Sequence, residues 1–377
     1  MNWENYLQTE LRIDRENHFE RHFVKLSEGM INLGSNDYLG LSNHPDVIEA
    51  ASQSIASHGM GNRAARLLAG HTELHEEMDA QIARLKMTEA ALSFPSGYTT
   101  SIGVIPAIAQ KQATIIIDEK AHACLWDGAR LSGARVRMVS HNDMDHLNEI
   151  LELERTQSQT HPILIIVESL YSMEGHRCPL KELIELKQRW NAWLLVDEAH
   201  ASGVFGNKGQ GLIESQEQSD QVEVQLGTLG KAIGTQGGFV AGSQPLISLI
   251  RQRARSFLFA TAAPPAIAAA SIASLKIIQS SEGAARRKHL FRLLGHLANN
   301  KIFPLDVVSP IIPISIGNEE RAAQIAGSLW AKKIYLPAIR FPTVPRGAAR
   351  LRLSVGAHHN ERDLDRVLML LKELIAI

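Results

Sequence analysis

The sequence predicts an α/β fold, in which a parallel or mixed β-sheet is covered by helices on both faces and is followed by a smaller α+β lobe. First, short, continuously apolar runs alternate with helix-length connections between about residues 90 and 245. Second, 45% of the 377 residues are hydrophobic and only 21% are charged, which suffices for two or three substructures with sizeable cores. Third, the composition shifts after Ala260, where a Pro pair precedes an Ala-rich stretch.

Six β-branched runs are the candidate strands of the main sheet. Strands buried on both faces are apolar throughout, and helix-length connections between them favour parallel crossovers. The runs are Thr114–Asp118, Val136–Ser140, Ile163–Glu168, Trp193–Asp197, Val222–Leu226 and Gly238–Ala241. The stretch Leu180–Arg189 has apolar residues at helical spacing, so it predicts a helix that covers the sheet.

The last third of the chain predicts a second domain. Its later half predicts a strand at Ile311–Ile316, a helix at Glu320–Lys333, a strand at Leu351–Val355 and a helix at Glu361–Leu374. We therefore expect an N-terminal segment at residues 1–40, a large domain at 41–270 and a small α+β C-terminal domain at 271–377.

Charge and hydropathy exclude several classes of partner. Lys plus Arg number 39 and Asp plus Glu number 40, so a net charge of −1 gives no bulk field to hold nucleic acid or an anionic membrane. The longest aliphatic runs, such as Ile163–Val167, are about five residues long, whereas a membrane-spanning helix needs about twenty. The polar, acidic start does not resemble a signal peptide, so we expect a cytoplasmic protein.

Cysteine and histidine patterns do not predict a metal site. Cys124 and Cys178 lie on unrelated segments without CxxC spacing, which argues against a disulfide framework or a thiolate zinc site. The 16 histidines show no HExxH or similar spacing. We therefore expect no metal and two free thiols.

Polar residues that follow the predicted strands are the candidates for chemistry, because ligands of open parallel sheets bind at the carboxyl ends of the strands. The run Trp193-Leu-Leu-Val-Asp197-Glu-Ala-His200 places an acid at the end of a buried strand, with a His three residues later. A buried carboxylate is costly without a cationic partner, and a protonated pyridine nitrogen is one such partner. The alternative for this segment is an Asp that caps the next turn.

A Gly-rich segment carries a single lysine, Leu226-Gly-Thr-Leu-Gly-Lys231-Ala-Ile-Gly-Thr-Gln-Gly-Gly238. It is not a P-loop, because Ala232 follows the Lys and only two residues separate Gly227 from Gly230. Gly-rich backbone allows a bulky ligand to approach closely, and a desolvated Lys becomes a usable amine for Schiff-base chemistry. A solvated loop lysine is the alternative.

Three further segments carry candidate binding residues. Phe94-Pro-Ser-Gly-Tyr98 opens a predicted helix whose free amides suit a phosphate, although an ordinary capped turn fits equally well. His122 follows the strand that ends at Asp118, and it is either a ring face for a planar ligand or an ordinary surface or core His. Arg350 and Arg352 share one face of a strand, where one Arg could grip a carboxylate or both could be solvated at an edge.

Taken together, these segments resemble the α-oxoamine synthases, the fold-type-I pyridoxal-phosphate enzymes that condense an amino acid with an acyl thioester. The resemblance runs from about Asn32 to the C-terminus. Five motifs carry it: Asn36-Asp-Tyr-Leu-Gly-Leu-Ser-Asn-His-Pro45, Ser172-Met-Glu-Gly175, Val196-Asp-Glu-Ala-His200, Gly227-Thr-Leu-Gly-Lys231 and Pro342-Thr-Val-Pro-Arg-Gly-Ala-Ala-Arg-Leu-Arg352. The implied fold is a large cofactor domain and a smaller C-terminal domain.

The resemblance implies a role in catalysis for four side chains. Lys231 would bond covalently to pyridoxal 5'-phosphate and later move the Cα proton of the substrate. Asp197 would pair with the pyridine nitrogen and keep it protonated, and His200 would hydrogen-bond the phenolic oxygen. His122 would stack on the ring.

The resemblance also implies binding residues. The amides of Gly97 and Tyr98, with Thr228, would hold the phosphate, and Ser172 would lie beside the cofactor. Thr261 matches a residue that reaches the cofactor of the neighbouring subunit, which implies a homodimer with shared active sites. For the substrate, Glu168 matches a polar residue beside the cofactor, while Asn36 and Arg352 match positions near the amino-acid carboxylate.

Within the family, the strongest likeness is to members that join L-alanine to a pimeloyl thioester, carried by coenzyme A or by a carrier protein, in biotin biosynthesis. Glycine C-acetyltransferase or another α-oxoamine synthase is the enzymatic alternative, and a catalytically silent partner subunit is the other. Two segments depart from the family pattern: Gly61-Asn-Arg-Ala-Ala-Arg66 introduces Arg63, and Ala121-His-Ala-Cys124 replaces a serine with Cys124. The roles of the N-terminal Arg12, Arg15 and Arg21 stay open.

Overall fold

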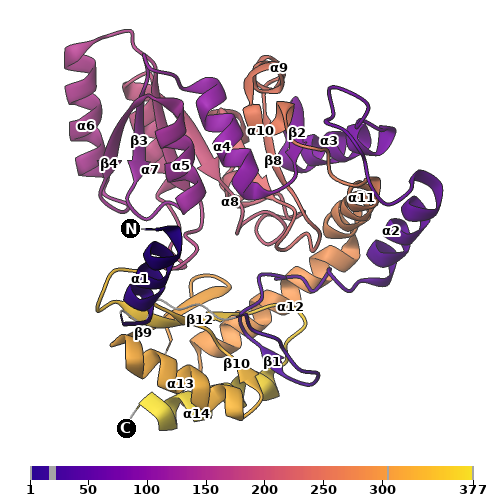
Figure 1. Ribbon diagram of the computed structural model, residues 1–377, viewed down its shortest axis with the longest axis vertical. Coiled ribbons are helices and arrows are strands. Elements are labelled where there is room, and N and C mark those ends of the chain that lie inside the picture. Colours follow the sequence, from indigo (N-terminus) through magenta and orange to yellow (C-terminus); the bar gives the residue numbers. More distant parts are fainter. Residues whose placement is uncertain (1, 17–22, 304, 376–377) are drawn as a thin grey trace. The chain divides into compact units, whose positions relative to one another are not determined.

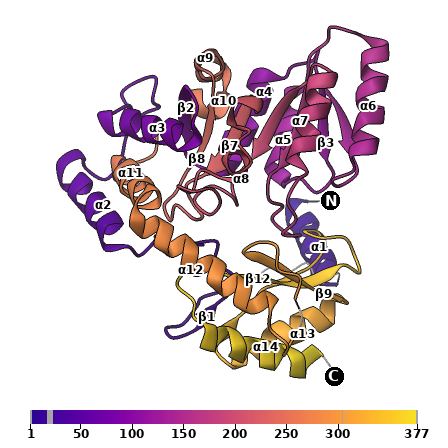
Figure 2. The ribbon, with the colours of Figure 1, turned by 180° about the vertical axis from the view of Figure 1, so that it is seen from behind.

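The computed structural model describes residues 2–16, 23–303 and 305–375, and the chain forms two compact units. The larger unit comprises Asn36–Leu293 with Gly356–His358, and the smaller comprises Met1–Ser35, Leu294–Val355 and His359–Ile377. The chain passes from the larger to the smaller unit after Leu293, whereas the sequence placed the start of the second domain near residue 270. Residue 270 lies inside helix α11, which packs on α2 and α3 of the larger unit (Figure 2). The domain limits predicted from sequence stay a prediction.

A seven-stranded sheet forms the centre of the larger unit (Figure 1). Its order is β2-β8-β7-β6-β5-β3-β4; neighbours from β4 to β7 are parallel, and β8 runs antiparallel to β7 and β2. The strands are β2 (Ala90–Phe94), β3 (Thr114–Asp118), β4 (Arg135–Val139), β5 (Ile163–Glu168), β6 (Trp193–Asp197), β7 (Val224–Thr228) and β8 (Gly238–Gly242). The predicted α/β class with a mostly parallel sheet is confirmed.

Helices cover both faces of this sheet because successive strand residues point to opposite sides. Ile115 and Ile117 pack with α4 and α5, while Ile116 between them packs with α6 and α7 (Figure 1). The helices of the larger unit are α2 (Pro45–His58), α3 (Glu73–Lys86), α4 (Gly97–Ile108), α5 (Ala123–Ser132), α6 (Met144–Gln157), α7 (Leu180–Arg189), α8 (Leu212–Ser215), α9 (Gln244–Arg253), α10 (Arg255–Leu258) and α11 (Pro265–Gln279). A 3-10 turn lies at Ser219–Gln221. The next helix, α12 (Ser281–Ala298), begins in the larger unit and ends in the smaller one.

The smaller unit has the α+β content expected of the C-terminal lobe. β12 (Ala349–Ser354) is the central strand of an antiparallel sheet, between β9 (Ile311–Gly317) and β11 (Ala338–Ile339). The remaining elements are α1 (Trp3–Glu16), a parallel pair of β1 (Ile31–Asn32) with β10 (Ile334–Tyr335), α13 (Glu319–Ala331) and α14 (Glu361–Ile375). Over the described residues, we find no helix with the length and hydropathy needed to cross a bilayer.

Candidate functional site

The carboxyl ends of neighbouring strands bring three predicted site residues to one edge of the main sheet. Glu168 is the last residue of β5, Asp197 of β6 and Thr228 of β7. Glu168 and Asp197 are register partners across their two strands, and Thr228 is the partner of Gly238 at the start of β8. This is the edge at which open parallel sheets bind ligands.

Lys231 lies in the Gly-rich turn that follows β7 and meets a histidine from the turn after β6. Its Nζ lies 2.8 Å from Nε2 of His200. The His200 side chain is buried, and its Nδ1 lies 2.7 Å from the hydroxyl of Tyr38. Lys231 is therefore packed against an imidazole rather than extended into solvent as a loop lysine.

Asp197 is almost buried and serves in part as a turn cap. Its Oδ1 accepts a 2.8 Å hydrogen bond from the backbone N–H of Ala199. This contact is the one that the turn-capping alternative predicts, but it uses a single carboxylate oxygen. Capping and charge pairing are thus compatible for this residue.

His122 is the N-cap of α5 and lies in the electric field of Asp197 and Lys231. Burial lowers the pKa of His122; the negative charge of Asp197 opposes this effect, and the positive charge of Lys231 adds to it. Nδ1 of the ring accepts the backbone N–H of Cys124 at 3.2 Å. The ring is therefore neutral near pH 7 with its proton on Nε2, which suits a flat, uncharged stacking surface.

Glu168 is a buried carboxyl group beside Asp197. Its Oε1 accepts the backbone N–H of His122 at 2.6 Å, which ties the end of β5 to the start of α5. Burial raises the pKa of Glu168 well above its ordinary value, and the charge of Asp197 raises it further, against the opposing effect of Lys231. Glu168 thus keeps its proton to a higher pH than an exposed glutamate does.

The turn that the sequence predicts to bind an anion lies at the start of α4. Ser96 caps the helix in a capping box with Thr99, so the first amides of α4 are held in helical geometry. A Cβ on Gly97 would lie 3.5 Å from Oγ1 of Thr228, so the end of β7 is adjacent to this helix start. Thr228 itself accepts from the N–H of Gly230 at 3.2 Å and donates to the carbonyl of Gly237 at 2.9 Å.

Close backbone packing positions this turn. A Cβ on Gly238 would lie 2.6 Å from the backbone nitrogen of Gly97 and 2.4 Å from Oγ1 of Thr100. Only glycine therefore lets β8 and α4 approach so closely. The side chain of Tyr98 points away from the buried core, since it is 46% exposed and its hydroxyl donates to Asp127.

The remaining predicted residues are spread over both units. Ser172 is buried in the turn after β5, Asn36 lies near Tyr38 in the larger unit, and Thr261 is exposed. Arg352 belongs to the smaller unit, where it lies on the central strand β12 rather than on an edge and is 5% exposed. Its Nη1 donates to the hydroxyl of Ser354 at 2.6 Å.

The two departures from the family pattern lie in different settings. Arg63 is exposed and has a positive φ of 62°. Cys124 is buried, its Sγ lies 3.0 Å from Nδ1 of His122, and burial raises the pKa of its thiol to about 12, so it stays a neutral thiol. Among the N-terminal arginines, Arg12 and Arg15 lie on α1, and Arg21 lies outside the described residues.

Sequence reasoning missed Tyr38 and the ion pair of Lys86 with Glu198. Tyr38 belongs to the motif that begins at Asn36, an expected substrate-binding residue. Its place two residues after Asn36 was the signal in the sequence that could have identified it. Lys86 and Glu198 are 1% and 0% exposed and hydrogen-bond each other, and Glu198 also accepts the N–H groups of Leu212 and Ile213. No local pattern links the end of α3 to a residue more than a hundred positions later.

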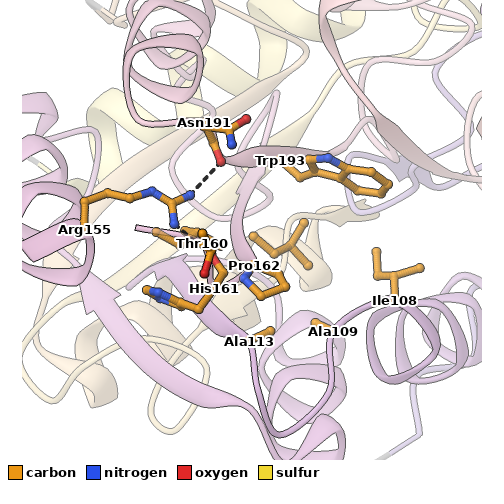
Figure 3. Close-up of a pocket in the computed structure, with 11 residues that line it drawn as sticks. Ile108, Ala109, Ala113, Arg155, Thr160, His161, Pro162, Asn191 and Trp193 are labelled. Carbon is orange, nitrogen blue, oxygen red and sulfur yellow. Dashed lines mark hydrogen bonds between the residues drawn. The ribbon is translucent and has the colours of Figure 1, made fainter. Parts of the chain in front are cut away.

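A separate cavity of about 370 Å³ lies at the opposite, amino-terminal edge of the strands (Figure 3). Trp193 at the start of β6 forms one wall, and Arg155 lies at the other side. The guanidinium of Arg155 donates to the backbone carbonyls of Trp190, His161 and Asn191 at 2.7, 2.8 and 2.6 Å. These bonds join the loops before β5 and β6, so the arginine has a structural role here.

Curated and solved proteins are similar to this chain over most of its length. The chain is 37% identical over 352 residues to 8-amino-7-oxononanoate synthase 1 of Bacillus velezensis, covering 92% of this chain and 88% of that protein. It is 38% identical over 346 residues to 8-amino-7-oxononanoate synthase of Methylobacterium nodulans, covering 92% and 87%. A serine palmitoyltransferase from S. paucimobilis, solved with a bound PLP–myriocin adduct, superposes with a TM-score of 0.89 at 28% identity, covering 98% of this chain and 96% of that one.

A solved 8-amino-7-oxononanoate synthase from Francisella tularensis shares the fold, with a TM-score of 0.78 at 24% identity over 93% of this chain and 99% of that one. The family model described as aminotransferase class I and II matches residues 28–371. This match covers nearly the whole chain and both units. The chain therefore belongs to the aminotransferase class I and II family.

Proposed function

We propose that the chain binds pyridoxal 5'-phosphate and joins L-alanine to a pimeloyl thioester, giving 8-amino-7-oxononanoate, carbon dioxide and the free thiol of the carrier, a step of biotin biosynthesis. The observation that carries the proposal is the grouping of Lys231, His200, Asp197 and His122 around the carboxyl ends of β5, β6 and β7. A location in the cytoplasm stays a prediction.

The donor set fits the chemistry of this cofactor. The carboxylate of Asp197 suits a protonated pyridine nitrogen, the amine of Lys231 can bond to an aldehyde, and the amides at the start of α4 suit a phosphate. The neutral ring of His122 offers a face for stacking. When bound, the cofactor supplies an electron sink for the carbanion that forms at Cα of the amino acid.

Each of the remaining side chains has a separate role in proton transfer or in binding the substrate. Lys231 removes and returns the Cα proton, and its contact with His200 places the amine at the carboxyl ends of the strands before the cofactor binds. Asn36 and Arg352 bind the carboxylate of the amino acid, which orients the Cα bond that must break. Burial and the charge of Asp197 raise the pKa of Glu168, so of the two neighbouring carboxyl groups Glu168 is the one whose affinity for a proton is raised.

A second copy of the chain completes the site in this proposal. Thr261 is exposed, and nearby Phe259 is 71% exposed. Met60 and Leu68, 69% and 80% exposed, lie on the loop that is joined to this segment by the hydrogen bond from Ala262 N–H to the carbonyl of Ala64. Exposed apolar side chains grouped in this way favour an interface, and a homodimer with shared active sites would cover them.

Reduction with borohydride tests the cofactor chemistry. Protein mixed with pyridoxal 5'-phosphate should show a visible absorbance band, and reduction should fix the cofactor on the peptide that contains Lys231. The variant Lys231→Ala should lose both signals, while Lys208→Ala, which removes an exposed lysine of the same unit, should keep both. A colourless wild-type protein would overturn every enzymatic proposal made here, and it is the result that a silent subunit predicts.

A substrate panel tests the choice of reaction. L-alanine with pimeloyl-CoA or a pimeloyl carrier protein is compared with glycine plus acetyl-CoA and with L-serine plus palmitoyl-CoA. We expect the highest kcat/KM with L-alanine and a pimeloyl thioester, because relatives that are named for this product match about nine-tenths of the chain. A higher value with glycine and acetyl-CoA would identify a glycine C-acetyltransferase instead.

Arg352 tests the carboxylate role. Arg352→Ala should raise the apparent KM for the amino acid by roughly tenfold or more, which is the usual effect of losing a hydrogen bond to a charged group. Arg352→Lys keeps the charge but not the paired donors, so its KM should fall between those of the wild type and the Ala variant. An unchanged KM in both variants would remove this role.

A further inference from the structure

A line of four polar groups in the larger unit runs from the reactive lysine to the start of that unit. Nζ of Lys231 lies 2.8 Å from Nε2 of His200, and Nδ1 of His200 lies 2.7 Å from the hydroxyl of Tyr38. The hydroxyl of Tyr38 in turn donates to Oδ1 of Asn36 at 3.1 Å. Both rings are buried, with Tyr38 at 0% and His200 at 4% exposure, so packing fixes their positions.

The number of protons on these groups limits which of them donates and which accepts at each contact. A tyrosine hydroxyl carries one proton, whereas Tyr38 faces two atoms that can accept it, Oδ1 of Asn36 and Nδ1 of His200. When the hydroxyl donates to Asn36, Nδ1 of His200 must donate to the hydroxyl oxygen. A neutral His200 then has its lone pair on Nε2, which faces the ammonium group of Lys231 and accepts from it.

The opposite orientation reverses the ring. When the hydroxyl of Tyr38 donates to Nδ1 of His200, the proton of the neutral ring lies on Nε2. Nε2 is then a donor. A donor at this atom is what a phenolic oxygen of the cofactor requires, and a donor there cannot accept from the ammonium form of Lys231.

We propose that Tyr38 is a positioning residue that selects which nitrogen of His200 carries the proton. In the protein without cofactor, the hydroxyl donates to Asn36 and Nε2 of His200 accepts from Lys231. With the cofactor in place, the hydroxyl turns to Nδ1 and Nε2 donates to the phenolic oxygen. The second state rests on the proposed function, while the first does not.

The first state is tested without cofactor. Nitrogen NMR of ¹⁵N-histidine-labelled protein, with the His200 signals assigned by their loss in His200→Gln, reports which ring nitrogen is protonated. We expect the Nδ1–H form in the wild type. In Tyr38→Phe, which keeps the ring and its packing, the ratio of the two forms should move about tenfold towards Nε2–H, which corresponds to about 1.4 kcal/mol.

A matched control separates this effect from the loss of any buried hydroxyl. Tyr171 is also 0% exposed in the larger unit, so Tyr171→Phe removes a comparable group at a different place. Its His200 signals should match those of the wild type. Wild-type protein in the Nε2–H form, or Tyr38→Phe with an unchanged ratio, would overturn the proposal.

The second state is read from the spectrum of the loaded protein. If His200 donates to the phenolic oxygen with the help of Tyr38, the pH midpoint of the visible band should differ between wild type and Tyr38→Phe, and the His200 signals of the wild type should change to Nε2–H on loading. If no band forms but the unloaded NMR result holds, the proposed function fails and the first state stands. If the band forms and neither the midpoint nor the signals change, the switch fails alone.

Discussion

At the scale of single residues, the buried ion pair between Lys86 and Glu198 lies next to Asp197, the last residue of β6. Removing one partner leaves a buried charge unpaired, so Lys86→Met should lower the free energy of unfolding by about 3–5 kcal/mol. Urea unfolding measures this loss. Arg84→Met breaks an exposed pair on the same helix, with Glu77 at 3.1 Å, and should cost no more than about 1 kcal/mol.

The double variant Lys86→Met with Glu198→Gln checks the cause of this loss. It removes both charges while a side-chain carbonyl can still accept the N–H groups of Leu212 and Ile213, so it should recover part of the stability. A double variant as unstable as Lys86→Met alone would show that the loss does not come from the unpaired charge of Glu198, but from another contact of Lys86 such as its hydrogen bond to the carbonyl of Gln210.

Glu168 gives a pH dependence whose sign follows from its raised pKa. Between the ordinary value of 4.5 and the higher folded value, folded Glu168 keeps its proton while the unfolded chain loses one. Its contribution to stability is therefore fully present below pH 4.5 and is lost as the pH rises towards the folded value. Glu168→Gln keeps an acceptor for the N–H of His122 without this penalty, so it should be more stable than wild type near pH 7 by about 1 kcal/mol or more.

Unfolding of the cofactor-free protein between pH 4 and 8 measures the effect. The two proteins should differ least at the acidic end, and their difference should grow with pH. Equal stability at every pH would show that Glu168 is ionised in the folded protein and has a cationic partner.

How far the site could be predicted depends on where the signal lies in the chain. Asp197, His200 and Lys231 follow apolar runs or stand among glycines, so local pattern made them candidates, and the structure brings Lys231 and His200 into contact. Tyr38 reaches His200 across 162 positions, and no spacing rule predicts such a contact. A contact between residues far apart in the chain is therefore harder to predict than a candidate residue that a local pattern marks.

At the scale of elements, the start of α4 is the helix end that we propose binds the phosphate of the cofactor. Ser96→Ala removes the capping box, so it should cost about 1 kcal/mol of stability and weaken binding of pyridoxal 5'-phosphate, because the first amides lose their fixed direction. Ser243→Ala removes the similar cap of α9, whose hydroxyl accepts from the N–H of Leu246. It should cost similar stability without changing the affinity for the cofactor, measured by fluorescence titration. If Ser96→Ala and Ser243→Ala bind pyridoxal 5'-phosphate equally tightly, the cap of α4 does not contribute to binding of the cofactor.

Elements were predictable where an apolar run or a helical spacing of apolar residues has clear ends. β3, β5, β6 and α7 have the predicted bounds, because their apolar runs end at polar or turn residues. β4 begins and ends one residue earlier than predicted, and β7 begins and ends two residues later, because Gly227 and Thr228 continue the ladder with β8. β2 was missed because Ala90-Ala-Leu-Ser-Phe94 has no β-branched residue, and pairing with β8 rather than intrinsic propensity makes it a strand.

At the scale of the whole molecule, the exposed apolar side chains around Thr261 predict the assembly. If a second copy covers Phe259 and Leu68, the charged variant Phe259→Glu with Leu68→Glu should convert a dimer into a monomer, measured by light scattering after size-exclusion chromatography. The monomer should also bind pyridoxal 5'-phosphate more weakly, because Thr261 of the other copy is lost. Leu153→Glu changes a 51% exposed leucine on α6 and should leave both mass and affinity unchanged. A wild-type monomer that binds the cofactor tightly would contradict the shared site, since one chain would then suffice.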